Sequence, residues 1–157
     1  MNNKNIWMKY AFRQAETAYK NDEVPIGSVV VKNDKIIGKG YNQVEILRDA
    51  TAHSEIIAIT SASNLMGDWR LNDCSLYVTK EPCLMCFGAI INSRIKNLYF
   101  GFEDMKNGFS SITEGDKSLF SNHLKLVESG IMATECKAIV QDFFNKKRKN
   151  SINNSVK

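Results

Sequence analysis

The spacing of apolar residues along the first part of the chain is that of one face of a helix. Between residues 7 and 20 they recur at intervals of three and four positions, at Trp7, Met8, Ala11, Phe12, Ala15, Ala18 and Tyr19. Such intervals predict an amphipathic helix. The predicted helix ends near the segment NDEVP.

Two short runs rich in β-branched residues follow, IGSVVVK and KIIGKGY, and they flank the dipeptide Asn33-Asp34. Asn and Asp accept the positive φ angles of a tight turn, so the two runs predict a β-hairpin. Later segments predict a loop at NQVEILRDAT, a helix from about Ala52, a strand at CSLYVTK, a helix at CLMCFGAIINS after Pro82, and a strand at NLYFGF. Residues 103–118 show no clear period, LKLVES predicts a last short strand, and residues 132–149 predict a final helix.

This order of helices and strands requires a sheet with helices packed on both of its faces. The predicted fold class is therefore α/β in three layers. A hairpin is antiparallel whereas helical crossovers favour parallel strands, so the sheet is predicted to be mixed. The chain shows no internal repeat and no linker, so residues 1–149 are expected to form one domain and the polar, basic residues 150–157 a disordered tail.

The length and cysteine content of the chain indicate a single-domain protein and argue against a secreted, disulfide-bonded one. A chain of 157 residues can close one core, and its four cysteines are too few and too unevenly placed for a secreted disulfide framework. The chain has no apolar run of about 18 residues, and its start lacks the features of a signal peptide. These observations favour a cytoplasmic protein without a membrane segment.

The positive charge is concentrated at the end of the chain. The formal net charge is +4, and the last twelve residues, KKRKNSINNSVK, hold five basic groups and no acidic one. Removing five positive charges from +4 leaves −1 for the rest of the chain. A basic end on a nearly neutral body suggests contact with a polyanion. The alternative is a solvated, frayed terminus.

Two cysteines at the start of a predicted helix have the spacing of metal ligands. Cys83 and Cys86 stand three residues apart, so both thiols can reach one ion, and a helix N-terminus favours their ionised form. A Cys-x-x-Cys pair could equally be a redox pair. Adding His53 gives one His and two Cys, a three-ligand zinc set that leaves one position open, as in catalytic rather than structural sites.

Glu55 follows His53 by two residues at the start of the predicted second helix. Two residues correspond to about 200° on an ideal helix, so Glu55 is not a second ligand beside His53. A glutamate in a first turn commonly just stabilises the helix dipole. Beside an open zinc site it can also move protons, because a bound metal lowers the pKa of water to about 7.

His-x-Glu, followed after about 27 residues by Pro-Cys-x-x-Cys, resembles the signature of the zinc nucleobase deaminases. Within that superfamily the chain most resembles the bacterial tRNA-specific adenosine deaminases. The resemblance covers residues 11–149 and rests on EVPIGSVVV, GKGYN, TAHSEI, LYVTKEPCLMCFGAIINSRI, FGFEDMKNG and ECKAIVQDFFNKKRK. It implies a cytidine-deaminase-like α/β/α fold with about five strands and, as partners, a tRNA anticodon stem-loop and a second copy of the chain.

The resemblance also assigns roles to residues. It implies that His53, Cys83 and Cys86 hold one zinc ion per chain and that Glu55 shuttles protons while adenosine at the wobble position becomes inosine. Residues that match family positions in contact with the target nucleotide or the anticodon loop are Asn42, Asp104, Lys106, Phe144, Lys147 and Arg148. Aromatic stacking and phosphate pairing are how proteins hold single-stranded RNA. Residues 109–126 depart from the family pattern, and no RNA contact is assigned to them.

Two alternative functions are considered. Deaminases of free bases or nucleotides share the zinc motif, but they do not account for the basic end of the chain. A non-catalytic zinc module that only binds RNA would keep the ligands and is expected to lose the proton shuttle, whereas this chain has Glu55.

Overall fold

A mixed five-stranded sheet forms the centre of the protein in the computed structural model, which describes residues 3–114, 116, 118, 120 and 122–155. The strands are β1 (Gly27–Lys32), β2 (Lys35–Tyr41), β3 (Ser75–Lys80), β4 (Asn97–Phe102) and β5 (Leu126–Glu128), in the spatial order β2-β1-β3-β4-β5. β1 pairs antiparallel with β2 and β3, whereas β3, β4 and β5 are parallel. The predicted three-layer α/β fold with a mixed sheet is confirmed.

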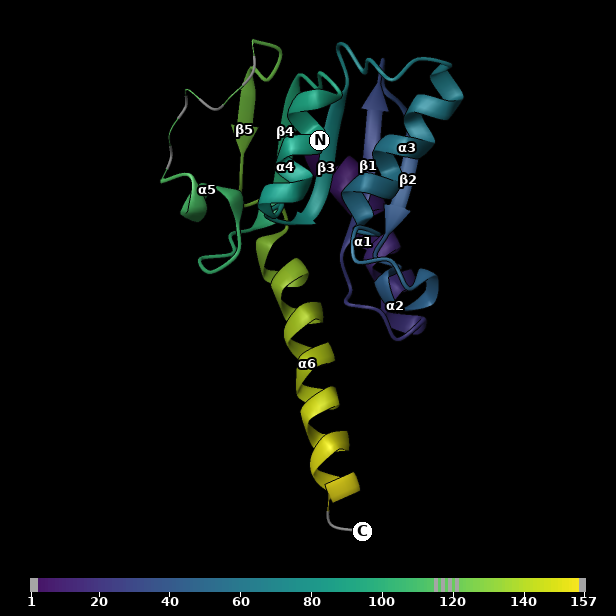
Figure 1. Ribbon diagram of the computed structural model, residues 1–157, viewed down its shortest axis with the longest axis vertical. Coiled ribbons are helices and arrows are strands. Elements are labelled where there is room, and N and C mark those ends of the chain that lie inside the picture. Colours follow the sequence, from purple (N-terminus) through teal and green to yellow (C-terminus); the bar gives the residue numbers. More distant parts are fainter. Residues whose placement is uncertain (1–2, 115, 117, 119, 121, 156–157) are drawn as a thin grey trace.

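The described residues form six α-helices around this sheet: α1 (Asn3–Lys20), α2 (Val44–Leu47), α3 (Ser54–Met66), α4 (Leu84–Asn92), α5 (Phe109–Ile112) and α6 (Ala133–Ser155). α1 and the first part of α6 cover one face, where Met8, Tyr77 and Cys136 belong to one buried cluster. α3 and α4 cover the other face over a second cluster that includes Ala58, Phe87 and Leu98. The far half of α6 extends away from the body of the molecule (Figure 1).

A tight turn closes the hairpin, and glycines in its strands allow helices to lie close against the sheet. Asn33 and Asp34 both have positive φ angles, 49° and 55°, as the predicted two-residue turn requires. Gly40 in β2 allows the start of α3 to lie against the sheet, because a Cβ atom there would stand 2.3 Å from the carbonyl oxygen of Ser54. Gly27 in β1 allows the middle of α1 to lie against the sheet, because a Cβ atom there would stand 2.1 Å from the carbonyl oxygen of Ala11.

The chain departs from the predicted elements in three places. The short helices α2 and α5 lie in segments predicted as loops, since four-residue helices are too short to show an apolar period. α1 begins at Asn3, ahead of its first apolar positions. α6 continues through Ser155, beyond the predicted end at residue 149, so residues 150–155 are helical where a disordered tail was expected. The division of the chain at residue 149 stays a prediction.

Within the described part of the chain, none of the helices is both long enough and apolar enough to cross a membrane.

Candidate active site

Three potential metal ligands meet where two helices begin on neighbouring parts of the sheet. His53 is the N-cap of α3 and Cys83 is the N-cap of α4, and both have extended backbone, with ψ angles of 153° and 172°. Cys86 lies in the first turn of α4 and is fully buried. His53 makes no side-chain capping bond to α3, so its ring is available to a ligand.

The side chains of this group converge on one point. Nδ1 of His53 lies 3.6 Å from Sγ of Cys83 and 3.5 Å from Sγ of Cys86. The three ligand atoms all lie within 4.8 Å of one another, and no other group of three His, Cys, Asp or Glu side chains among the described residues comes together in this way. One imidazole nitrogen and two sulfurs suit zinc, and three protein ligands leave its fourth position for a reactant.

The charges of the group are also those of a metal site. A hydrogen bond from the Cys86 thiol lowers the pKa of Cys83 to about 4, while the same bond and burial raise the pKa of Cys86. The hydrogen bond with Cys83 raises the pKa of His53. The lowered pKa favours the thiolate form of Cys83, and metal binding would release the protons that the other ligands carry.

Glu55 lies beside the three ligands without joining them. It is in the first turn of α3, only 4% exposed, and burial raises the pKa of its carboxyl group. The carboxylate also contributes to the raised pKa of Cys86, which places it within reach of the metal group. One carboxylate oxygen, Oε2, accepts a hydrogen bond of 3.0 Å from the Ser54 hydroxyl.

A cavity of about 680 Å³ opens next to His53. This volume is within the range of sites that bind a small molecule or a nucleotide. Its walls come from the loop after α1, the start of α2, the metal group and α6. The lining residues are Asn21, Asp22, Glu23, Val24, Asn42, Val44, Glu45, His53, Lys80, Phe143, Phe144 and Lys147.

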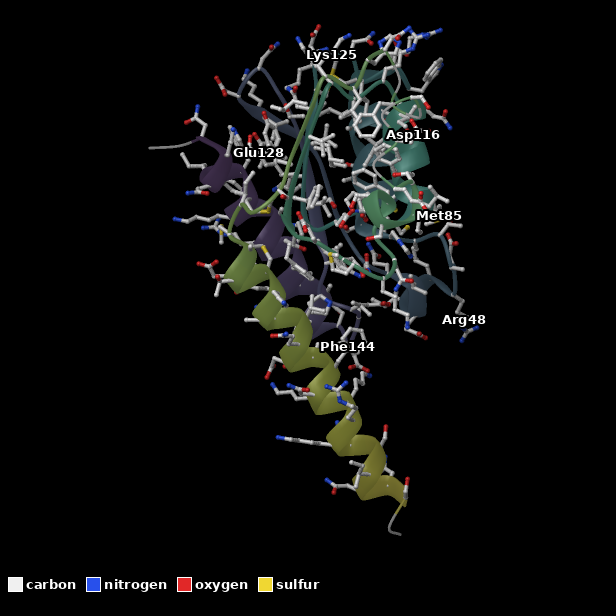
Figure 2. All side chains as sticks on the ribbon, turned by 90° about the vertical axis from the view of Figure 1, so that its left-hand side faces the viewer. Arg48, Met85, Asp116, Lys125, Glu128 and Phe144 are labelled. Atoms are coloured by element: carbon white, nitrogen blue, oxygen red, sulfur yellow. The ribbon has the colours of Figure 1, made fainter. Side chains whose placement is uncertain are left out.

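Three of the residues predicted to bind substrate line this cavity: Asn42, Phe144 and Lys147. Asn42 is 6% exposed, and its Oδ1 atom accepts a hydrogen bond of 2.8 Å from the backbone amide of Ser54. This bond fixes the amide, so Nδ2 is the donor that Asn42 can present. Phe144 is 42% exposed on α6 (Figure 2), whereas its neighbour Phe143 is buried.

Asp104 is not among the residues that line the cavity, but it contacts Lys80, which is. Its carboxylate pairs with Lys80 at 2.7 Å and accepts hydrogen bonds of 3.0 Å from the backbone amides of Lys106 and Asn107. Burial acts to raise the pKa of Asp104, but the bonds to Lys80 and to the two amides outweigh it and lower the pKa. The structure therefore gives Asp104 a role in shaping its loop.

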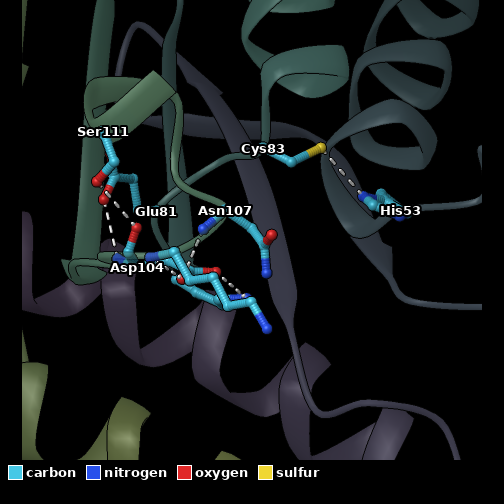
Figure 3. A network of polar contacts seen from close by, with 8 residues as sticks. His53, Glu81, Cys83, Asp104, Asn107 and Ser111 are labelled. Carbon is cyan, nitrogen blue, oxygen red and sulfur yellow. Dashed lines mark hydrogen bonds and ion pairs between the residues drawn. The ribbon is translucent and has the colours of Figure 1, made fainter. Parts of the chain in front are cut away.

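Glu81 fastens this loop to the segment that carries the metal ligands (Figure 3). Glu81 is 3% exposed, and its carboxylate accepts bonds of 2.9 Å from the backbone amides of Asp104 and Ser110 and a further bond from the Ser110 hydroxyl. A backbone bridge joins Cys83 to Gly108. Cys83 and the loop that contains Asp104 are thus one connected unit.

The remaining two predicted contacts are not brought to the cavity. The Lys106 side chain is exposed on the loop after β4, and the Arg148 side chain is exposed on α6, where its guanidinium bonds to Asn145. Neither residue is among those that line the cavity.

Sequence reasoning missed several residues that build the site, among them Asp22, Glu23, Ser54, Lys80 and Glu81. Glu23 and Glu81 each precede a proline segment and are almost fully buried, which no apolar period reveals. Glu23 accepts a hydrogen bond of 2.7 Å from the Ile46 amide and so holds α2 beside the cavity. The available signal was a proline shortly after each acid, Pro25 and Pro82.

Known proteins that resemble this chain are deaminases. The chain matches the MafB19-like deaminase family over residues 2–148. A tRNA-specific adenosine deaminase from Buchnera aphidicola subsp. Schizaphis graminum (strain Sg) is 46% identical over 150 residues, covering 94% of this chain and 97% of that protein.

Solved structures of deaminases are also similar to this chain. One, from a study of A-to-I editing by tRNA:A34 deaminases at the wobble position of transfer RNA, has a TM-score of 0.77 and 37% identity, covering 85% of this chain and 97% of that one. A guanine deaminase from Bacillus subtilis has a TM-score of 0.62 and 34% identity, covering 78% of this chain and 73% of that one. The tRNA-specific relatives therefore share somewhat more of the sequence, 46% and 37% against 34%. The fold does not separate the two groups, because a guanine deaminase from Nitrosomonas europaea has a TM-score of 0.76 at 22% identity.

Proposed function

The chain belongs to the family of bacterial tRNA-specific adenosine deaminases, and we propose that His53, Cys83, Cys86 and Glu55 form the site at which it deaminates adenosine to inosine at the wobble position of a tRNA anticodon. The overall reaction consumes water and releases ammonia. The observation that carries the proposal is the placement of a buried carboxylate beside the His-Cys-Cys group at the wall of the 680 Å³ cavity.

The metal proposed for this site is one zinc ion per chain. The nitrogen and two sulfurs of His53, Cys83 and Cys86 are the ligands that zinc prefers, and their mutual distances within 4.8 Å fit one ion. When bound, zinc acts as a Lewis acid that makes a water molecule a nucleophile near neutral pH.

Glu55 is the proposed proton carrier. It takes a proton from the attacking water and gives it to the ring nitrogen of adenine as carbon 6 is attacked. It then takes the second proton from the oxygen that is now bonded to carbon 6 and delivers it to the amino group, which leaves as ammonia. A group with this task must hold a proton as readily as it gives it up. Burial supports this role because it raises the pKa of Glu55 above that of an exposed glutamate.

The cavity suits a base that is turned out of a single-stranded loop. Asn42 can donate from Nδ2 to an acceptor atom of the base, and Phe144 offers an exposed ring on which a neighbouring base can stack. Lys147 adds a positive charge at the same wall. We propose that these three residues contact the anticodon stem-loop, together with Lys106 and Arg148 at its outer edges. A tRNA substrate also agrees with the cytoplasmic location expected from the sequence.

A second copy of the chain is the other proposed partner. Apolar side chains are exposed on α2 and at the start of α4, where Ile46, Leu47, Leu84 and Met85 are between 38% and 54% exposed. An apolar surface of this kind commonly marks a contact between protein chains. Met85 and Arg48, which directly follows α2, lie on the same side of the molecule (Figure 2). We propose that this side forms the homodimer.

Deamination of a free base is the alternative function, supported by the likeness to the guanine deaminase. The two are separated by incubating the zinc-loaded protein with an anticodon stem-loop that has adenosine at the wobble position, and in parallel with free adenosine, cytosine and guanine. The expected result is inosine in the stem-loop alone. Ammonia release from free guanine or cytosine without inosine in the stem-loop would replace the proposed function by the alternative.

A further inference from the structure

Two serine hydroxyls are buried together behind the carboxylate of Glu55. Ser28 lies in β1 and Ser54 is the first residue of α3, and neither is exposed at all. Their oxygen atoms are 2.7 Å apart, and Ser54 Oγ is 3.0 Å from Glu55 Oε2. Burying two hydroxyls costs free energy unless both are hydrogen-bonded. Here both belong to a line of hydrogen bonds that runs from Ser28 through Ser54 to Glu55.

The direction of this line follows from the number of protons. An ionised carboxylate can only accept, so the hydroxyl of Ser54 donates to Glu55. Ser54 has a single hydroxyl proton, and the proton between the two serines must therefore come from Ser28. Ser28 donates to Ser54, which donates to Glu55. A hydroxyl that accepts one bond is a stronger donor in the next, so Ser28 strengthens the bond that reaches the carboxylate.

The line is anchored on rigid backbone at both ends. Ser28 is in the strand that pairs with both β2 and β3. Ser54 lies against β2 at the close approach to Gly40. Its backbone amide donates a hydrogen bond of 2.8 Å to Oδ1 of Asn42. Ser54 thus contacts two proposed site residues by separate groups, Asn42 through the backbone and Glu55 through the side chain.

We infer that Ser28 and Ser54 are positioning residues that hold the Glu55 carboxylate in the one orientation from which it can exchange protons with water and adenosine. This inference rests on the proposed function and adds to it two residues outside the metal set. The Glu55 side chain has three rotatable bonds, and its Oε2 atom is fixed by a hydroxyl whose own position is set from the sheet. Oε1 is then the oxygen turned toward the reactants.

Substitution of the serines by alanine tests the inference, because Ser54→Ala removes the hydroxyl and keeps the backbone amide that orients Asn42. In the zinc-loaded protein we expect kcat for the stem-loop to fall about tenfold in Ser54→Ala, as for loss of one hydrogen bond to a charged group, with KM within twofold. Ser28→Ala should reduce kcat by about two- to threefold. The double variant should match Ser54→Ala, since Ser28 acts only through Ser54.

Ser93→Ala is the matched control. Ser93 is a buried serine that bonds to the carbonyl oxygen of Ile90 at the other end of α4. Its loss removes a buried hydroxyl of the same kind without touching the line to Glu55. We expect Ser93→Ala to change thermal stability but to leave kcat unchanged.

Two further measurements identify Glu55 as the residue through which the serines act. In a Glu55→Ala background, adding Ser54→Ala should not lower the residual rate further. In crystal structures of the zinc-loaded protein, Glu55 should occupy a single conformer in the unsubstituted chain and a different or divided one in Ser54→Ala, a result that needs no substrate.

The contrary results are equally definite. A kcat of Ser54→Ala within twofold of the unsubstituted chain, or an unchanged Glu55 conformer, would show that the hydroxyls only satisfy each other. Equal losses with and without Glu55 would also overturn the inference. Absence of inosine with the unsubstituted chain would instead contradict the proposed function, while the crystallographic comparison would still decide the inference.

Discussion

The ammonium group of Lys147 lies 2.5 Å from the carboxylate of Asp22, so the last helix is tied to the loop after α1 at the wall of the cavity. Both side chains are well exposed, 46% and 75%, and such a pair contributes little to stability in water. Next to this ion pair, the Tyr19 hydroxyl accepts a hydrogen bond from Lys146 and donates one to Asp142. A phosphate that binds Lys147 must therefore replace Asp22 as its ion-pair partner.

The first prediction follows from this competition. Asp22→Asn removes the carboxylate that holds Lys147 and one negative charge beside the proposed RNA path, so the stem-loop should bind about two- to fivefold more tightly at low salt. Asp73→Asn is the control, because Asp73 pairs with Lys96 at the opposite end of β3, away from the cavity. Titration of a labelled stem-loop measures both. If the two variants bind the stem-loop with equal affinity, Asp22 does not compete with RNA for Lys147.

Truncation after Asn145 tests the basic end of α6. It deletes Lys146, Lys147, Arg148 and Lys149 but keeps Phe144 at the cavity. Each lost phosphate contact should lower the log–log salt slope of binding by about 0.7, the value for single-stranded nucleic acid. Circular dichroism and zinc content establish that the shortened chain is intact. Unchanged affinity and slope in an intact protein would show this end of the helix to be solvated surface.

Loss of one thiol should release the metal. Cys83→Ser replaces a soft sulfur ligand by a hydroxyl, and zinc per chain should fall from about one to well below one half after dialysis. Cys74→Ser is the matched control, since Cys74 is also buried but bonds to the backbone of Asn72 outside the metal group. Elemental analysis gives the ratio. Full zinc content in Cys83→Ser would refute the ligand assignment.

Asp104 provides a prediction about pH. Its pKa is lowered in the folded chain, so the carboxylate contributes stability above the pKa of the unfolded chain, near 4, and that contribution is lost as the pH falls through the folded value. Asp104→Asn keeps an acceptor for the backbone amides but loses the ion pair with Lys80.

Denaturant unfolding of the two proteins checks this expectation. At pH 7 the variant should be less stable by about 1 to 2 kcal/mol, and the difference should close as the pH falls below about 4. A difference that is the same at pH 7 and pH 3 would show that the ion pair with Lys80 contributes nothing to folding.

The sequence predicted that His53, Cys83 and Cys86 come together, because the signals for this group are local. A histidine and a Cys-x-x-Cys pair at helix starts are visible from spacing, and the fold brings them within 4.8 Å. The buried acids Glu23 and Glu81 act on backbone amides far along the chain, at Ile46 and at Asp104 and Ser110, so their roles depend on packing that no period shows. Phe143 and Phe144 are adjacent in sequence, and only the packing of α6 shows which one is buried.

Asp104 shows what a resemblance between sequences does not reveal. Resemblance assigned it a contact with the target nucleotide, whereas in the structure its carboxylate is already bonded to Lys80 and to two backbone amides. A residue-by-residue comparison of motifs transfers positions but not the hydrogen-bonding partners that each side chain finds. That RNA contact therefore stays a prediction, as do those of Lys106 and Arg148.

The rate of inosine formation with and without Glu55 tests the central claim most directly. A stem-loop with adenosine at the wobble position is incubated with zinc-loaded unsubstituted protein and with Glu55→Ala of equal zinc content, and nucleosides are measured by mass spectrometry. The account predicts inosine at that position alone and a rate about 10² to 10⁴-fold lower in Glu55→Ala, because proton transfer is lost while the ligands remain. Inosine formation within about threefold of the unsubstituted rate would contradict it, since Glu55 would then be no more than a buried acid at the start of α3.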